Sequence, residues 1–107
     1  LGMEVKVLQD LLGRLCKLGL LIRLTEKRYF SPSTLLDLAK IIEAIINENN
    51  NGYLDLKKFR DESGMGRNLA IVVLDFFDKA GFTQLGNEGR FIKKPISEVS
   101  LFKRSFD

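Results

Sequence analysis

The sequence lacks histidine and tryptophan and contains a single cysteine, Cys16, in 107 residues. One thiol cannot close a disulfide within the chain, and without histidine it cannot complete the ligand set of a zinc site. Histidine is also the commonest general base, and no glycine-rich phosphate loop or H-E-x-x-H motif is present. Catalysis by carboxylates alone stays open, but we expect a chain that is not an enzyme and holds no cofactor or metal.

Long apolar runs are also missing. No segment approaches the roughly 18 apolar residues of a membrane span, and the opening lacks the basic start, apolar block and cleavage site of a signal peptide. We therefore expect a cytoplasmic protein that does not bind membranes. The chain opens with Leu1 and Gly2 and has its first methionine at Met3, which is typical of a piece of a longer protein.

The composition is that of a globular chain, with 45% hydrophobic and 29% charged residues. Its length allows one domain or two very small ones. The net charge of +3 permits a polyanionic partner without requiring one. Residues 31–94 hold nine basic and nine acidic residues, so a nucleic-acid surface there would need the charges to be segregated.

Apolar residues recur at gaps of three and four through residues 4–18, which predicts a helix. Residues 20–30 carry two apolar arms around a short polar turn, which predicts a hairpin. Ser31 and Pro32 predict the start of a second helix, which the turn-forming run at 47–52 would end.

The second half continues with Tyr53 and Leu54 as candidates for a short strand and Asp55 as a candidate N-cap. The elements predicted after them are a helix over 56–63, a tight turn at 64–66, a long helix over 67–80 and a hairpin over 82–94.

The chain matches itself when it is shifted by 62 residues. The apolar stripe of the first helix falls on that of residues 67–80, Gly19 falls on Gly81, and Arg28 falls on Arg90. A helix, a glycine stop and a hairpin with arginine on its return arm therefore occur twice at one spacing.

Two helices joined by a glycine-bearing turn and followed by a hairpin define a helix-turn-helix with a wing. The sequence predicts a mainly α fold with small β-hairpins, an α+β winged helix. We expect residues 1–30 to be the C-terminal part of a preceding winged-helix module, residues 31–94 to be a complete winged-helix RNA-binding domain, and residues 95–107 to be a C-terminal tail.

The predicted helix 67–80 is apolar around most of its circumference, so most of it must be buried. The positions expected to be exposed are Arg67, Asn68, Ile71, Asp75 and Asp78. The helix dipole and the unpaired backbone N–H groups favour a phosphate beside Arg67, whereas the two carboxylates would repel one further along. This favours contact through the start of the helix over contact along its length.

Other cations are expected to flank that start, on the preceding helix and on the wing, and Gly66 would let a ligand approach the backbone closely. The predicted RNA-binding residues are Lys57, Lys58, Arg60, Gly66, Arg67, Asn68, Arg90 and Lys93. Residues expected to pack in the interior are Phe59, Phe76, Phe77, Phe82 and Cys16.

The segment from Phe59 to Ile92 resembles the carboxy-terminal winged-helix domain of the bacterial selenocysteine-specific translation elongation factor. The pattern is Phe-Arg-Asp, then Gly-x-Gly-Arg, Ala-Ile, Leu-x-x-Phe-Asp and Gly-Phe-Thr. Here it is formed by Phe59, Arg60, Asp61, Gly64, Gly66, Arg67, Ala70, Ile71, Leu74, Phe77, Asp78, Gly81, Phe82 and Thr83.

The resemblance implies that the chain binds an mRNA hairpin that recodes UGA as selenocysteine, with Arg60, Arg67 and Asn68 as the best contact residues. It also implies that the GTPase, the selenocysteinyl-tRNA site and the ribosome contacts belong to a missing part of the protein. The wing, with only Arg90 before its lysines, is poorer in arginine than is usual in the family. We expect a monomer.

Two other functions stay open. A winged helix can be a DNA-binding transcription regulator that reads duplex half-sites, although the acidic residues of the third helix count against it. The balanced charge of residues 31–94 is also compatible with a winged helix that binds only proteins.

Overall fold

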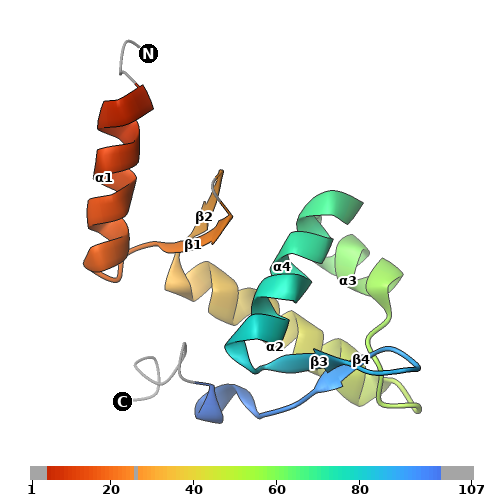
Figure 1. Cartoon of the computed structure of the whole chain (residues 1–107). Coiled ribbons are helices and arrows are strands. Elements are labelled where there is room, and N and C mark those ends of the chain that lie inside the picture. Colours follow the sequence, from red (N-terminus) through yellow and green to blue (C-terminus); the bar gives the residue numbers. More distant parts are fainter. Residues whose placement is uncertain (1–4, 26, 100–107) are drawn as a thin grey trace.

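The computed structural model describes residues 5–25 and 27–99, with the backbone alone for residues 5–7 (Figure 1). Its elements in chain order are α1 (Val5–Lys17), β1 (Ile22–Thr25), β2 (Arg28–Phe30), α2 (Pro32–Glu48), α3 (Leu56–Ser63), α4 (Arg67–Ala80), β3 (Thr83–Leu85), β4 (Arg90–Ile92) and the 3-10 turn η1 (Ile96–Glu98). Each hairpin is a two-stranded antiparallel sheet. The predicted order of helix, helix, turn, helix and wing is confirmed.

Side-chain caps and glycines set the helix ends where the sequence placed them. The Ser31 hydroxyl accepts a hydrogen bond from the backbone N–H of Thr34 at the start of α2, and the Asp55 carboxylate accepts one from Lys58 at the start of α3. Gly81 ends α4 with φ 86°, a left-handed conformation that glycine adopts without a Cβ clash.

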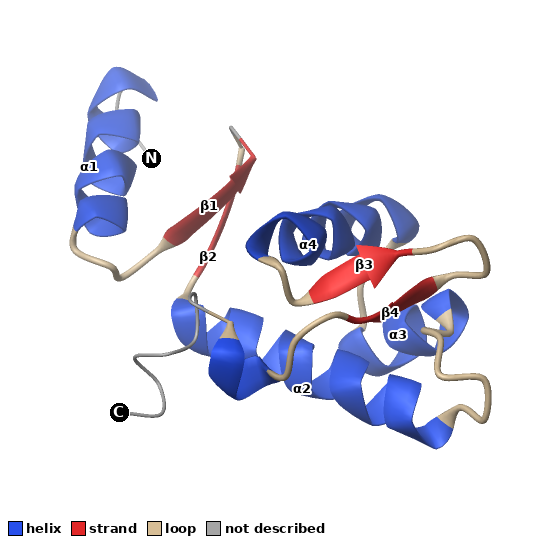
Figure 2. Cartoon of the chain, turned by 60° about the horizontal axis from the view of Figure 1, so that its bottom comes forward, coloured by secondary structure: helices blue, strands red, loops and turns tan. Residues whose placement is uncertain are grey.

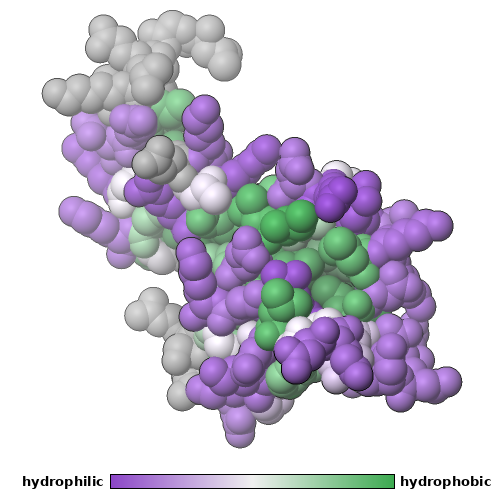
Figure 3. Space-filling view, turned by 45° about the vertical axis from the view of Figure 1, so that its right-hand side comes forward, coloured by the Kyte–Doolittle hydropathy of each residue, from purple (hydrophilic) through white to green (hydrophobic). Residues whose placement is uncertain are grey.

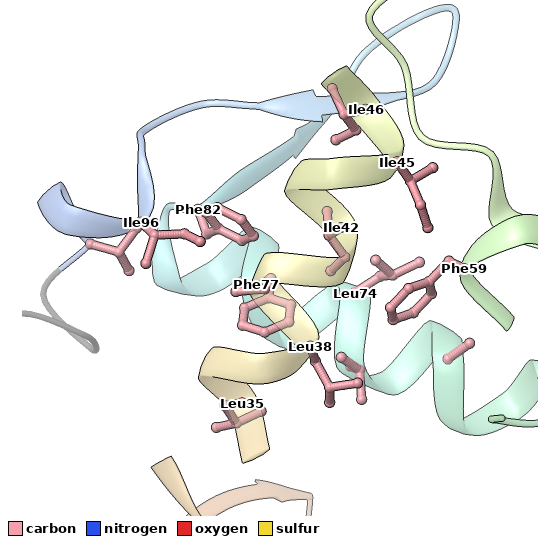
Figure 4. Packing of buried hydrophobic residues seen from close by; sticks show 14 residues of the cluster. Leu35, Leu38, Ile42, Ile45, Ile46, Phe59, Leu74, Phe77, Phe82 and Ile96 are labelled. Carbon is pink, nitrogen blue, oxygen red and sulfur yellow. The ribbon is translucent and has the colours of Figure 1, made fainter. Parts of the chain in front are cut away.

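The core lies between α2, α3 and α4, and the wing closes one end of it (Figure 4). Phe77 and Phe82 are fully buried and meet edge to face, with ring centroids 5.3 Å apart. Phe59 enters from α3 and is also fully buried. The α2 side of the core is formed by Leu35, Leu38, Ala39, Ile42, Ile45 and Ile46.

The core continues past the wing. Ile96 and Val99 are buried in the same cluster, so the chain after residue 94 closes over the core as far as it is described. Residues 100–107, the rest of the predicted tail, lie outside the described residues.

The β1–β2 hairpin packs against this core, where β1 contacts α4 (Figure 2). Side chains alternate across a strand, and Ile22 and Leu24 are half-buried while Arg23 and Thr25 are exposed. Together with Phe30, the two half-buried residues pack against the main cluster, which fixes the hairpin beside α4.

The 62-residue repeat is present in the structure. Helices α1 and α4 begin 62 positions apart, at Val5 and Arg67, and strands β2 and β4 do the same, at Arg28 and Arg90. Both helices are followed by a glycine with positive φ. The copies differ in burial, because Leu8 and Leu11 of α1 are exposed, whereas the stripe of α4 is buried. That residues 1–30 belong to another module stays a prediction.

Several local expectations were wrong. Tyr53 and Leu54 form no strand, although the Leu54 N–H donates to the carbonyl of Arg90 at 2.8 Å. Ile71 and Asp78 are half-buried, not exposed, and Cys16 is half-buried, not buried. Phe76 is half-buried but packs against the core, as expected. Each lies at the margin of an apolar stripe, where helical periodicity does not decide burial. Within the described residues, no helix is long and apolar enough to span a membrane.

Candidate nucleic-acid interface

The start of α4 is an open helix terminus. Its N-cap is Gly66, which makes no side-chain cap hydrogen bond, and no acidic residue lies in the first turn. The first backbone N–H groups of a helix have no partner within the helix and carry the positive end of its dipole. Arg67 and Asn68 are both exposed here. An anion at this end would meet unpaired donors and one cationic side chain.

The turn that presents this terminus is tied to the body of the protein. Met65 packs against the core, and its N–H donates to the Ser63 hydroxyl. Gly64 needs its left-handed φ of 75°, but Gly66 has φ −73° and ψ 168°, which any residue can adopt. A Cβ at Gly66 would meet nothing within 4 Å. Neither backbone conformation nor packing therefore requires glycine at this position.

Among the predicted RNA-binding cations, Arg60 has a buried side-chain donor that makes no hydrogen bond. Its side chain is half-buried, and its Nε is buried without a hydrogen-bond partner. An unsatisfied buried donor costs about 1–3 kcal/mol. Arg60 and Arg67 form no ion pair with any carboxylate of the described residues. The exposed guanidinium of Arg67 is thus available to an incoming acceptor, whereas the Nε of Arg60 is covered by the protein.

The two predicted lysines of α3 differ from each other. Lys57 is exposed and forms no ion pair within the described part of the chain. Lys58 donates to the Glu48 carboxylate at 2.7 Å. This hydrogen bond raises the pKa of Lys58 above its ordinary value. Lys58 therefore stays charged at neutral pH, but a neighbouring carboxylate already balances that charge.

Arg90 faces inward, onto α4. Its Nε donates to Asp78 at 3.1 Å and its Nη2 donates to Asp75 at 3.0 Å, with only 16% of the side chain exposed. The Thr83 hydroxyl also donates to Asp78, at 2.6 Å. The wing is thereby fastened to α4, and both acidic side chains of the helix are neutralised. The sequence carried no signal for this network, because Arg90 lies 12 residues from Asp78 and 15 residues from Asp75 along the chain. The wing turn brings them together only in the folded protein.

Lys93 is not brought to the start of α4. Its N–H donates to the carbonyl of Phe82 at 2.8 Å, just beyond the glycine that ends the helix. A helix of 14 residues is about 21 Å long. The structure therefore gathers Gly66, Arg67 and Asn68 at one end of α4 and leaves Lys93 at the other. The predicted RNA contacts of all eight residues stay predictions.

The face seen from the side of α3 and the wing is mixed in polarity (Figure 3). A strip of hydrophobic side chains crosses it, and hydrophilic side chains surround the strip. Leu85 of the wing is 60% exposed. A ligand on this face would meet apolar surface as well as charges.

A helix-turn-helix with an appended wing and an uncapped basic helix start is the architecture of a winged-helix domain. Residues 45–92 match the family model described as the winged helix of elongation factor SelB. The resemblance that the sequence indicated, to the winged-helix region of bacterial selenocysteine-specific elongation factors, is confirmed.

Two curated relatives are the selenocysteine-specific elongation factors of Haemophilus influenzae and Escherichia coli. The first is 28% identical over 82 residues and the second 29% identical over 83 residues. These alignments cover 77% and 78% of this chain but only 13% of each relative. The chain thus spans a small part of the length of the proteins it matches.

A solved structure with the same fold is the mRNA-binding domain of elongation factor SelB from E. coli in complex with SECIS RNA. It superimposes with a TM-score of 0.79 at 26% identity, over 87% of this chain and 75% of that one. The match extends well beyond residues 45–92, so the arrangement of most of this chain is shared with that domain.

The network around Arg90 generates a prediction about stability. Asp78→Ala removes the acceptor for both Arg90 and Thr83 in a half-buried site, and we expect the free energy of unfolding to fall by about 1.5–3 kcal/mol. Asp75→Ala, the matched control, removes a single ion pair from a carboxylate that is 58% exposed. It should cost about 0–1 kcal/mol. Urea denaturation measures both, and equal losses would contradict the assigned roles.

Proposed function

We propose that this chain binds a structured mRNA hairpin of the SECIS type and is the RNA-anchoring module of a selenocysteine-specific elongation factor. The observation that carries the proposal is the open start of α4, with Arg67 and Asn68 exposed and no acidic residue in the first turn. The similarity to an mRNA-binding domain in complex with SECIS RNA supports RNA as the ligand.

The geometry suggests how the hairpin is held. A phosphate at the start of α4 would accept hydrogen bonds from the unpaired backbone N–H groups and from Arg67. Arg60, which is half-buried on α3, would supply a second guanidinium. Asn68 has both a donor and an acceptor, so it is suited to an unpaired loop base. Lys57 would add charge at the rim.

Arg90 and Lys93 have other roles in this proposal. The hydrogen bonds of Arg90 to Asp75 and Asp78 make it a positioning residue, because they hold the wing and cancel the carboxylates that would repel a phosphate. Lys93 and Lys58 would contribute only to the overall electrostatic attraction of the RNA. Lys93 lies at the far end of α4, and the charge of Lys58 is balanced by Glu48.

The functions of the whole factor are a wider part of the proposal. GTP hydrolysis, delivery of selenocysteinyl-tRNA and contact with the ribosome would reside in other parts of a longer cytoplasmic protein. The present chain would act as a monomeric, non-catalytic anchor that brings those activities to a UGA codon. The charge and fold of the described residues support the RNA contact alone.

A competition experiment tests RNA against the DNA alternative. The chain is mixed with a labelled candidate hairpin and titrated with a loop-scrambled hairpin or with duplex DNA of matched length. We expect both competitors to displace the label only at much higher concentration, because unpaired loop bases carry the sequence information in RNA. Equal competition by duplex DNA would favour a DNA-binding protein, and no hairpin binding at low salt would favour a protein-interaction domain.

Arg67→Ala tests the position of the site. Loss of one phosphate contact should weaken hairpin binding severalfold and lower the dependence of log Kd on log salt by about one ion. Lys40→Ala is the control, since Lys40 is an exposed cation on α2 and not on the core-facing stripe. Fluorescence anisotropy from low to moderate salt measures both, and a parent-like Arg67→Ala would place the site elsewhere.

Gly66→Ser separates binding from folding. Serine is compatible with the backbone at this N-cap, meets no neighbour there, and can accept a hydrogen bond from the first turn of α4. We expect the free energy of unfolding, measured by thermal denaturation, to stay equal or to rise by a few tenths of a kcal/mol. Hairpin affinity should fall, because the hydroxyl occupies a donor that the phosphate needs. Unchanged affinity at unchanged stability would argue against phosphate binding at this terminus.

A further inference from the structure

We propose that Asn51 is a site of spontaneous deamidation, and that its isoaspartate product releases the loop between α2 and α3 from the wing. Asn51 lies in that loop and is followed by Gly52. It is the one asparagine of the sequence, out of six, that precedes a glycine. The modification needs only water and takes place without RNA, so it is independent of the proposed function.

The reaction joins two neighbouring groups of the chain. The backbone nitrogen of Gly52 loses its proton and attacks Cγ of Asn51, a C–N bond forms, and the side-chain amide takes up a proton and leaves as ammonia. Water then opens the resulting succinimide ring. Attack at the side-chain carbonyl gives aspartate, and attack at the backbone carbonyl gives isoaspartate, whose main chain runs through Cβ and Cγ. Water thus replaces ammonia, and nothing is oxidised or reduced.

The Asn-Gly pair is open to water and to the base that removes the proton. Asn51 and Gly52 are both exposed. Glycine has no Cβ to shield its nitrogen, and a Cβ built at Gly52 would meet nothing within 4 Å. The other five asparagines are followed by glutamate, asparagine or leucine, whose side chains crowd the attacking nitrogen. Steric access therefore favours Asn51 alone.

The fold also supplies a donor for the charge that develops in the reaction. The Tyr53 N–H donates a hydrogen bond to Oδ1 of Asn51 at 2.9 Å. This Asx turn folds the side-chain amide back over the Gly52 peptide. Attack on Cγ places negative charge on Oδ1, and a donor already at hydrogen-bond distance stabilises that charge. The local structure thus favours the ring closure that the sequence permits.

One hydrogen bond opposes the attack. The Gly52 N–H donates to the carbonyl of Asn49 at 3.2 Å, and this bond must open before the nitrogen can react. Backbone hydrogen bonds in solvent-exposed turns open locally, at a much smaller free energy than that of global unfolding. The opening leaves the buried cluster of the core intact. We therefore expect the reaction in the folded protein.

The residues after Asn51 attach the loop to the wing. The Asn49 side-chain amide donates to the carbonyl of Tyr53 at 2.7 Å. The Tyr53 ring meets the Phe91 ring of β4 edge to face, with centroids 6.4 Å apart. The Leu54 N–H donates to the carbonyl of Arg90 at 2.8 Å. A change in the main chain at Asn51 therefore acts directly on these contacts.

The two products affect this attachment differently. Aspartate keeps the length of the main chain and an oxygen that accepts from the Tyr53 N–H, so the contacts with the wing stay. Isoaspartate adds a methylene to the main chain, which displaces Tyr53 and Leu54 relative to β4. The wing then remains held to α4 by Arg90 and loses its second attachment, to the α2–α3 loop.

Mass spectrometry of the ageing chain tests the site. Samples are kept at neutral and at mildly alkaline pH, folded or unfolded in guanidinium chloride, and the conversion of each asparagine is followed in peptides. In the folded chain Asn51 should convert faster than every other asparagine, and at a rate within about tenfold of that in the unfolded chain. Conversion of Asn51 in the unfolded chain alone would overturn the proposal, as would equal conversion of the other asparagines.

Gly52→Asn tests the role of the attacking nitrogen. Asparagine tolerates the left-handed φ of 77° but adds a Cβ beside the nitrogen. It should slow the conversion of Asn51 by about an order of magnitude. The matched control is Gly64→Asn, the same substitution at another left-handed glycine with nothing within 4 Å, and it should convert at the parent rate. Thermal melting of both variants reports on folding, and equal rates would overturn the mechanism.

Hydrogen exchange tests the release of the wing. Nuclear magnetic resonance of an aged sample resolves the parent, aspartate and isoaspartate forms, and the Leu54 amide reports on its bond to the wing. Its exchange should be faster by about tenfold in the isoaspartate form, which loses this bond. Asn51→Asp should match the parent. Equal exchange in all forms would overturn the release, and fast exchange in Asn51→Asp would show that charge and not main-chain length is the cause.

Discussion

The burial of one face of α4 against α2 and α3 decides which parts of this molecule can meet a ligand. Ala70, Val73, Leu74 and Phe77 are buried along the helix, and Phe59 closes the gap to α3. An apolar helix can be stable in water only if this face is covered. Its packed length is then closed to a nucleic-acid groove, and its first turn becomes the place where backbone donors and side chains are presented together.

The second consequence of this packing concerns charge. With α4 fixed on the core, its two aspartates stand beside the return strand of the wing, and Arg90 bridges them. A guanidinium in this position strengthens the attachment of the wing and removes the repulsion that the carboxylates would exert. The wing is therefore held on the helix by its arginine, while the exposed arginines Arg67 and Arg28 lie at the helix start and in the neighbouring hairpin.

The two halves of the repeat illustrate how small differences in sequence give different roles to equivalent elements. Both consist of a helix, a left-handed glycine and a hairpin with arginine at the start of the return strand. In the second copy, carboxylates on the helix capture the arginine. In the first, glycine and cysteine occupy those positions, and Arg28 remains exposed. The pattern was visible in the sequence, but its electrostatic meaning required both copies to be seen in space.

The sequence by itself determined the helices, their caps and the hairpins, because these depend on local signals: the spacing of apolar residues, the N-caps Ser31 and Asp55, and glycines in left-handed conformations. It also placed Arg67 at the start of α4. Only the tertiary structure decided the partners of Arg90, the distance of Lys93 from the helix start and the half-burial of Ile71 and Asp78. Those properties depend on which side chains of separate elements meet, and periodicity along one element carries no information about its neighbours.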